Sequence, residues 1–383
     1  METRKLYYED CHLTSFTGKV TACVASEKGY AVTLDATAFY PEGGGQACDV
    51  GTLGEVRVLD VQEQGGRVIH LCDGPLTEGA VVTGRIDYGR RFDLMQQHTG
   101  EHIISGIIHR RFGYQNTGFH VGAELVTVDF DGMISQDALA EVEEEANRAV
   151  YRNLPLRCWY PTPEELPEVF YRTKRALPWP VRIVQIPQVD SCACCGIHTA
   201  YTGEVGLIKL FSCVKFHQGV RIEMACGDRA RRLMNAIYEQ NRLVSQAFSA
   251  KPTETGAAAQ RMNEALAAEK FCSTGLRRRI YEMTAEGYRG QRLAVHFEAG
   301  LTPGQLRQLA EQISTQAELA AVFTGNDSAY EVCFAGPAAK PVGAAMAQAL
   351  QGRGGGKEGF FQGKLSCTEQ QIRSFFTEHT EKF

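Results

Sequence analysis

The stretch Met95-Gln-Gln-His-Thr-Gly-Glu-His-Ile-Ile-Ser-Gly106 predicts a helix that carries two histidines on one face. It contains good helix formers and no proline. His98 and His102 stand four residues apart, and positions i and i+4 share a helix face, so both imidazoles can reach one point. Such a pair is half of a zinc site, although an isolated pair is more often an ordinary surface or core pair.

A cysteine cluster nearly a hundred residues later can supply the other half of a zinc site. It reads Asp190-Ser-Cys-Ala-Cys-Cys-Gly-Ile-His-Thr199, in which Cys194 and His198 are four residues apart around a glycine. A glycine there allows a tight turn. One thiolate and one imidazole, added to two imidazoles, complete a tetrahedral zinc site. We therefore expect one Zn²⁺ per chain, with the ligands His98, His102, Cys194 and His198.

Cys192 and Cys195 are alternative sulfur ligands, and together they form a Cys-x-x-Cys pair. Such a pair can be redox-active, but no thioredoxin-like sequence surrounds it, which disfavours that function. The other cysteines are scattered, and the N-terminal METRKLYYEDCHL lacks an apolar signal core. We therefore expect reduced thiols and a cytoplasmic protein.

Length and composition indicate a folded multidomain protein. The 383 residues exceed the size that one core normally supports. Hydrophobic content of 44% and charged content of 22% are ordinary for a soluble protein. No apolar run is long enough to span a bilayer, so no membrane partner is expected. The net charge of −5 neither indicates nor excludes nucleic acid. Local basic groups occur at Arg90-Arg91, Arg110-Arg111, Arg229 with Arg231-Arg232, and Arg277-Arg278-Arg279.

The pattern along the chain predicts an α+β multidomain fold with four parts. Residues 1–88 contain short β-rich runs (17–25, 30–34, 55–62, 67–71 and 80–86) separated by turns, which is typical of a small N-terminal β-barrel. Residues 89–227 mix helices and strands, including an acidic helix that Ser135 is expected to cap. Residues 228–288 have helical periodicity and predict a helical hairpin or coiled coil. Residues 289–383 alternate strands and helices and predict a C-terminal α/β domain.

A glycine-rich loop interrupts the first part at residues 35–49. Gly43, Gly44 and Gly45 are consecutive, which allows close backbone approach. Backbone N–H groups freed there can bind an anion or a carbonyl group. The alternative is a flexible hairpin tip.

A second glycine-rich loop lies at residues 352–364. Arg353, Gly355, Gly356 and Lys357 can present N–H groups and cations to phosphate. It is not a Walker motif, because Gly-Lys-Ser/Thr is absent, so we do not expect ATP binding. A structural glycine turn is the alternative.

Four stretches together resemble the alanyl-tRNA editing family, whose stand-alone members are similar to the editing part of alanyl-tRNA synthetase. They are Thr37-Ala-Phe-Tyr-Pro-Glu-Gly-Gly-Gly-Gln46, His98-x-x-x-His102, Cys194-Cys-Gly-Ile-His198 and Gly354-Gly-Gly-Lys357. They follow the family's order along nearly the whole chain. Cys195 and Ile197 stand where the family usually has Gly and Thr.

The resemblance implies an aminoacyl-tRNA deacylase that acts in trans. Its substrate would be tRNA specific for alanine, tRNA(Ala), wrongly charged with serine or glycine, and the reaction would cleave the aminoacyl ester. A synthetase pocket for a small side chain cannot reject close analogues by binding alone, so a second, hydrolytic site is needed. The resemblance also implies that the last part is a DHH-associated domain. With the helical part, it would bind tRNA or pair two subunits as a homodimer.

Three residues are candidates for catalysis. The family motif points to Thr37 and Gln46 as contacts of the aminoacyl group. Glu101 is a candidate general base by its chemistry, and the alternative is that it faces away as a supporting or surface carboxylate.

Two other functions fit parts of the sequence. His98-Thr-Gly-Glu-His102 matches the inverted zinc-protease pattern His-x-x-Glu-His, although the cysteine cluster would then be unused. Four protein ligands would also suit a structural zinc in a non-catalytic tRNA-binding protein.

Overall fold

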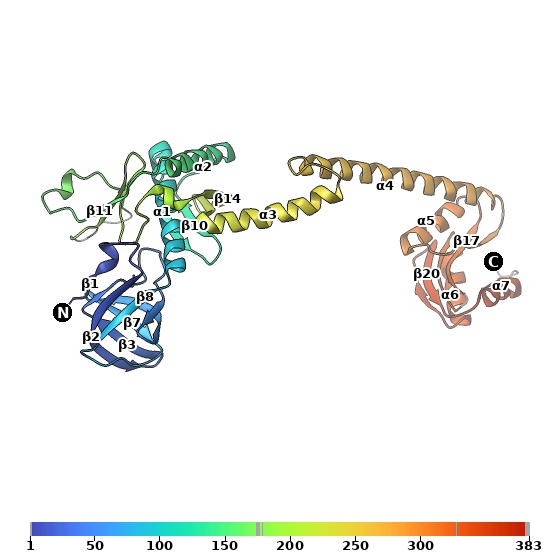
Figure 1. Cartoon of the computed structure of the whole chain (residues 1–383). Coiled ribbons are helices and arrows are strands. Elements are labelled where there is room, and N and C mark those ends of the chain that lie inside the picture. Colours follow the sequence, from blue (N-terminus) through green and yellow to red (C-terminus); the bar gives the residue numbers. More distant parts are fainter. Residues whose placement is uncertain (1, 174–176, 178, 327, 380–383) are drawn as a thin grey trace. The chain divides into compact units, whose positions relative to one another are not determined.

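The structure, a computed structural model, describes residues 2–173, 177, 179–326 and 328–379. Its helices and sheets confirm a mixed α+β multidomain chain (Figure 1). The chain divides into two compact units, Met1–Leu243 and Val244–Phe383. The finer division at residues 88, 227 and 288 stays a prediction.

The first unit begins with a closed barrel in the strand order β2-β3-β7-β6-β5-β8. Alternate residues of β2, such as Phe16 and Val20, point into the barrel core, as the two-residue period of a strand requires. β5 is too short to show this alternation, and sequence analysis missed it. The strands are β2 Ser15–Ser26, β3 Gly29–Leu34, β5 Gly51–Leu53, β6 Val56–Gln64, β7 Arg67–Cys72 and β8 Val81–Ile86, and outside the barrel β1 Arg4–Lys5 pairs with β4 Ala36–Thr37.

Two further sheets and the helices α1 (Tyr88–Phe112) and α2 (Gln136–Tyr151) follow the barrel in the first unit. The two helices share a hydrophobic core with a four-stranded antiparallel sheet. Ile104 of α1, Val142 of α2 and Val128 of the sheet are fully buried in this core. Ser135 caps α2 as expected, since its hydroxyl accepts from the Ala138 N–H. The strands are β9 Asn116–Val121, β10 Val126–Phe130, β14 Ile208–Phe216 and β15 Gly219–Cys226, and a smaller sheet contains β11 Arg157–Trp159, β12 Ile183–Ile186 and β13 Asp190–Ala193.

α1 is buried on all sides from Leu94 to Ile108. Two glycines let neighbouring strands approach it closely. A Cβ atom on Gly100 would lie 2.2 Å from the sulfur of Cys226, and one on Gly106 would lie 2.4 Å from the Val189 carbonyl oxygen. Any larger residue at either position would push β15 or β13 away from the helix.

A buried ion pair joins α1 to the barrel. Arg91 is 0% exposed and donates to both carboxylate oxygens of Asp49 and to the carbonyls of Ala38 and Cys11. Asp49 also accepts from the backbone N–H of Tyr40. Leaving one of two buried charges unpaired costs roughly 3–5 kcal/mol. The pair therefore fixes the glycine-rich loop relative to the helix.

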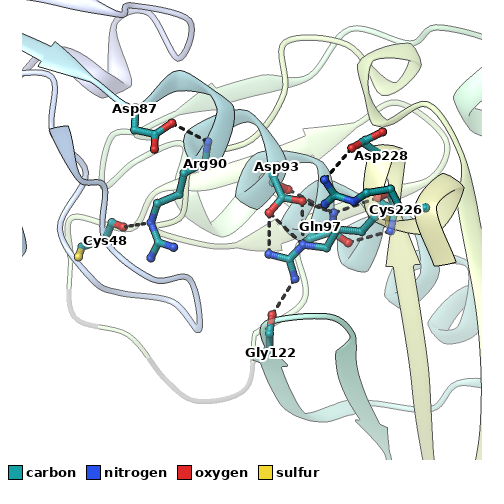
Figure 2. Close-up of polar contacts among 10 residues, drawn as sticks. Cys48, Asp87, Arg90, Asp93, Gln97, Gly122, Cys226 and Asp228 are labelled. Atoms are coloured by element: carbon teal, nitrogen blue, oxygen red, sulfur yellow. Dashed lines mark hydrogen bonds and ion pairs between the residues drawn. The ribbon is translucent and has the colours of Figure 1, made fainter.

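A second set of polar contacts anchors the start of α3 (Gly227–Ala247) on α1. Figure 2 shows these contacts around Asp93 and Gln97. Arg229 donates to both carboxylate oxygens of Asp93 and to the Gly122 carbonyl. Gln97 exchanges two hydrogen bonds with the backbone of Cys226. The side chain of Arg229 therefore stabilises the packing of α3 on α1.

The second unit contains α4 (Thr255–Glu286) and a five-stranded sheet with two buried faces. Successive residues of β17 point to opposite faces, so Phe323 packs with one core and Val322 with the other. The predicted alternation of strands and helices is present, but residues 352–364, expected to be a loop, contain β19 and most of β20. The elements are β16 Leu293–Phe297, α5 Pro303–Ile313, β17 Leu319–Asn326, β18 Ala329–Ala335, α6 Ala339–Ala349, β19 Arg353–Gly355, β20 Phe360–Leu365 and α7 Glu369–Glu378.

Two predictions about this region are not decided. The apolar side chains of Met262, Leu266, Leu276 and Ile280 on α4 are each at least half exposed. A helical hairpin or coiled coil therefore stays a prediction, as does the identity of the last part as a DHH-associated domain.

Inside the barrel, His70 is fully buried and neutral. Its Nδ1 donates to the Val32 carbonyl over 3.0 Å, and its Nε2 accepts from the Thr37 hydroxyl over 2.9 Å. Burial lowers the pKa of His70 to about 4, because the charged imidazolium would lose its hydration.

Acid should therefore destabilise the first unit through His70. The unfolded chain takes up a proton below about pH 6.5, whereas folded His70 does so only near 4. The contribution of neutral His70 to the free energy of unfolding is complete above pH 6.5. It falls by about 3 kcal/mol as the pH falls to 4. His70→Gln keeps an acceptor for Thr37 but does not titrate, so denaturant unfolding should show a weaker pH dependence. Equal pH dependence in both proteins would contradict this account.

The second glycine-rich loop offers a matched pair of substitutions. A Cβ atom on Gly354 would lie 2.6 Å from the Gln362 carbonyl oxygen and 2.6 Å from the Phe361 ring, whereas nothing lies within 4 Å of one on Gly355. Gly354→Ala should destabilise the second unit by about 1–3 kcal/mol through overpacking. Gly355→Ala should leave the unfolding temperature almost unchanged. Thermal unfolding of the full chain measures both, and the reverse order would refute the packing assignment.

Candidate metal centre

Four side chains from two distant segments meet at one buried point. His98 and His102 come from α1, and Cys194 and His198 follow β13; their ligand atoms all lie within 4.8 Å of one another. The sulfur of Cys194 is 3.4 Å from Nε2 of His98. The three imidazoles are 2–3% exposed. The structure thus brings the four predicted ligands into a group that can hold a metal ion.

Hydrogen bonds at Nδ1 orient two of the imidazoles. Asp190 lies 2.9 Å from Nδ1 of His102, and the side-chain oxygen of Gln46 lies 2.8 Å from Nδ1 of His98. A ring that donates from Nδ1 keeps its Nε2 lone pair free for a metal. This requirement also fixes the amide of Gln46, which must present oxygen, and not nitrogen, to His98.

His198 provides the test of whether these residues fit a metal. Both of its ring nitrogens are buried and lack a hydrogen-bond partner among the residues that the structure describes. Leaving a buried polar group unsatisfied costs about 1–3 kcal/mol, and a metal ion would satisfy one of these two nitrogens. Burial lowers the pKa of His198 to about 3, so the ring is neutral and able to bind metal. Three imidazoles and one thiolate are a set that zinc prefers.

The electrostatics of the cysteine cluster favour Cys194 as the sulfur ligand. Burial by itself would raise the pKa of Cys194, but the neighbouring imidazoles, His98 foremost, hold it well below the ordinary value. Burial raises the pKa of Cys192 to about 11 and also raises that of Cys195. Metals bind the thiolate form, which only Cys194 of these three favours.

The loop that carries Cys194 is held by residues that sequence analysis did not identify. Arg182 donates to the carbonyl oxygens of Cys194 and Gly196, over 3.0 and 2.8 Å. The hydroxyl of Tyr8 donates to the Cys195 carbonyl over 2.6 Å. Neither Arg182 nor Tyr8 lies in a motif, so the sequence offered no signal for them.

The first glycine-rich loop lies against this group. Gly44 and Gly45 have φ of +60° and +80°, which favours glycine. A Cβ atom on Gly44 would lie 3.2 Å from the sulfur of Cys195, and one on Gly45 would lie 2.5 Å from the Phe119 ring. The side-chain nitrogen of Gln46 is buried and unpartnered among the described residues. Substrate binding by Gly43, Gly44 and Gly45 stays a prediction.

Glu101 and Thr37 make structural hydrogen bonds. Glu101 is 5% exposed, and its carboxylate accepts from the hydroxyl of Ser105 and the amide of Asn116, so it does not lie on the surface. The hydroxyl of Thr37 contacts His70, as described above. Catalytic roles for Glu101 and Thr37 stay predictions.

The basic groups differ in their environment. Arg110 and Arg111 at the end of α1 pair with Glu145 and Glu141 of α2. In the second unit, Arg353 is exposed on the edge strand β19. A role in tRNA binding for Arg353, Gly355, Gly356 and Lys357 stays a prediction.

None of the described helices is long and apolar enough to span a membrane.

Comparison with known proteins gives matches along the chain. Residues 2–90 match the family model of tRNA synthetases class II (A), and residues 181–223 match the threonyl and alanyl tRNA synthetase second additional domain. The alanyl-tRNA editing protein Aarsd1-B of Xenopus laevis is 27% identical over 94% of this chain and 94% of its own length. The resemblance to the alanyl-tRNA editing family is confirmed. Aarsd1 of Mus musculus is also 27% identical, with the same coverage.

Two further matches are to alanyl-tRNA synthetases. The alanine–tRNA ligase of Pyrococcus furiosus is 35% identical over 68% of this chain, which corresponds to 30% of the ligase. The C-Ala domain of Aquifex aeolicus alanyl-tRNA synthetase matches with a TM-score of 0.21 and 17% identity, over 24% of this chain and 92% of that domain.

Substitution of single cysteines should identify the sulfur ligand. Cys194→Ala removes the only cysteine of the cluster whose pKa is lowered, so the purified protein should lose its zinc. Cys195→Ala, the control from the same loop, should retain one zinc per chain, measured by elemental analysis. Zinc loss from the Cys195 variant alone would reassign the ligand.

Proposed function

We propose that this chain is a trans-editing hydrolase that cleaves the aminoacyl ester of tRNA(Ala) wrongly charged with serine or glycine. The observation that carries the proposal is the buried group of three imidazoles and one thiol, which a glycine-rich loop covers. The similarity to alanyl-tRNA editing proteins over 94% of the chain supports the same activity.

His98, His102, Cys194 and His198 would hold the zinc ion. Zinc with four protein ligands has no open position, so the aminoacyl group would have to displace one ligand or add as a fifth, and zinc would then polarise or orient it as a Lewis acid. The neutral imidazole of His198 and the lowered pKa of the Cys194 thiol leave both side chains ready for this role.

Gln46 is the residue that we assign to the ester itself. Its oxygen is engaged with His98, so its amide N–H groups are directed elsewhere and have no partner among the residues that the structure describes. A buried, unsatisfied donor beside the metal group can donate to the ester carbonyl oxygen as negative charge develops there. A donor placed beside the four candidate ligands supports a catalytic site over a non-catalytic tRNA-binding protein.

Glu101 is the weaker catalytic candidate. Its hydrogen bonds to Ser105 and Asn116 support a role in holding α1 against β9. The inverted zinc-protease alternative needs Glu101 as a base and leaves Cys194 and His198 idle, yet both lie in the same group as His98 and His102. The structure therefore favours the editing function.

Deacylation of charged tRNA tests the proposal directly. The purified protein should release amino acid from seryl- and glycyl-tRNA(Ala) faster than from alanyl-tRNA(Ala), and a chelator should abolish the release. Protein that binds tRNA(Ala) with full zinc but hydrolyses none of these esters would support the non-catalytic alternative. Activity that persists without zinc would refute the metal's role.

Two variants of Gln46 separate its two contacts. Gln46→Glu keeps an oxygen acceptor for His98 but loses the amide donor, so it should retain zinc and lose on the order of 10²-fold in deacylation rate. Gln46→Ala removes both contacts and should also bind zinc more weakly. Gln64→Glu, on the exposed end of β6, is the matched control and should keep full activity. Unchanged activity in Gln46→Glu would remove Gln46 from the mechanism.

A further inference from the structure

Arg172 lies in the long connection between β11 and β12, outside every motif that sequence analysis identified. Its backbone runs beside β13: its N–H donates to the Ser191 carbonyl over 2.8 Å, and its carbonyl accepts from the Ala193 N–H over 2.9 Å. Arg172 is thus paired in parallel with Cys192 as an isolated bridge. This pairing brings the guanidinium to the interior of the unit.

The side chain of Arg172 forms a two-pronged ion pair with Asp190. Its Nε donates to Oδ1 over 2.7 Å and its terminal nitrogen donates to Oδ2 over 2.8 Å. The side chains of Arg172 and Asp190 are 9% and 1% exposed. Oδ2 of Asp190 also accepts from Nδ1 of His102 over 2.9 Å. The three side chains therefore form one continuous, buried chain of contacts that ends on a metal ligand.

We propose that Arg172 is a positioning residue for the metal centre and acts through Asp190 on His102. Because Arg172 holds both oxygens of Asp190, the carboxylate cannot rotate away from His102. The imidazole is then fixed with its Nε2 toward Cys194 and His198. This inference rests on the proposed metal site.

The same contacts link the metal to the packing of the connection around Arg172. If Arg172 favours metal binding, thermodynamic reciprocity requires bound metal to favour the docked position of Arg172. Metal should therefore protect the backbone N–H of Arg172 and of Ala193 from hydrogen exchange, beyond the protection seen in metal-free protein. Loss of the guanidinium should remove this extra protection.

Arg221 provides a control in the same unit that is matched in geometry, with a side chain that is more exposed, at 35%. It joins β15 to β10 with the same two-pronged geometry toward Asp129, at 2.7 and 2.8 Å. Neither Arg221 nor Asp129 contacts a residue of the metal group in any of these bonds. Loss of either ion pair can lower stability, whereas a positioning role predicts an effect on metal affinity only at Arg172.

The experiment measures metal affinity in the full chain. Zinc is competed against a chromophoric chelator in the wild type, Arg172→Gln, Arg172→Lys and Arg221→Gln. Arg172→Gln should bind zinc 10–100-fold more weakly. The zinc affinity of Arg172→Lys should lie between those of Arg172→Gln and the wild type, because an ammonium group cannot hold both carboxylate oxygens of Asp190. Arg221→Gln should match the wild type. Cobalt substituted for zinc should show a changed visible spectrum only in the Arg172 variants.

The outcomes separate this inference from the proposed function. If the wild type binds neither zinc nor cobalt, the metal site fails and the role of Arg172 fails with it. If the wild type binds both metals and Arg172→Gln binds them equally well with an unchanged cobalt spectrum, only the positioning role is overturned. Should Arg172→Gln not fold, Arg172→Lys and Asp190→Asn give the same comparison, and wild-type affinity in both would overturn the inference.

Discussion

The ion pair between Arg91 and Asp49 is shielded completely from water, and the geometry of the site depends on it. It attaches the barrel to the helix that carries His98 and His102, since Arg91 lies two turns before His98 on that helix. Asp49 ends the loop that carries Gln46, so the same contact brings the loop to the metal group. A pair of this kind tolerates no loss of one partner, because the remaining charge would be buried alone.

Around the metal group, each orienting contact comes from a different element. Gln46 from the barrel loop holds His98, and Asp190 from β13 holds His102. Arg182 holds the backbone on both sides of Cys195. The orientation of the ligand side chains is therefore set by hydrogen bonds from neighbouring residues. These residues come together only when the whole unit has folded.

What the sequence could predict follows from local rules. The four-residue steps from His98 to His102 and from Cys194 to His198 are local, and so is the capping of α2 by Ser135. The partners of these ligands were not predictable, because Gln46 and Asp190 reach them across separations that no periodicity encodes, and Arg172 contacts Asp190 in the same way. Strands β5 and β19, three residues each, were missed because so short a run shows no alternation. For Thr37 and Glu101 the motif indicated importance but not the hydrogen bonds that each side chain makes.

The order of the ligands along the chain has a consequence for folding. His102 and Cys194 are separated by 92 positions (194 minus 102), so a metal bound by both closes a long loop in the same way as a covalent cross-link. Closing a loop of that length removes conformational freedom from the unfolded chain worth about 4–5 kcal/mol in the chain-entropy description. The ion would thereby connect α1, formed early in synthesis, to a hairpin that leaves the ribosome much later. A cell short of zinc would then contain less of the folded protein. Zinc shortage would therefore lower the amount of protein as well as its activity.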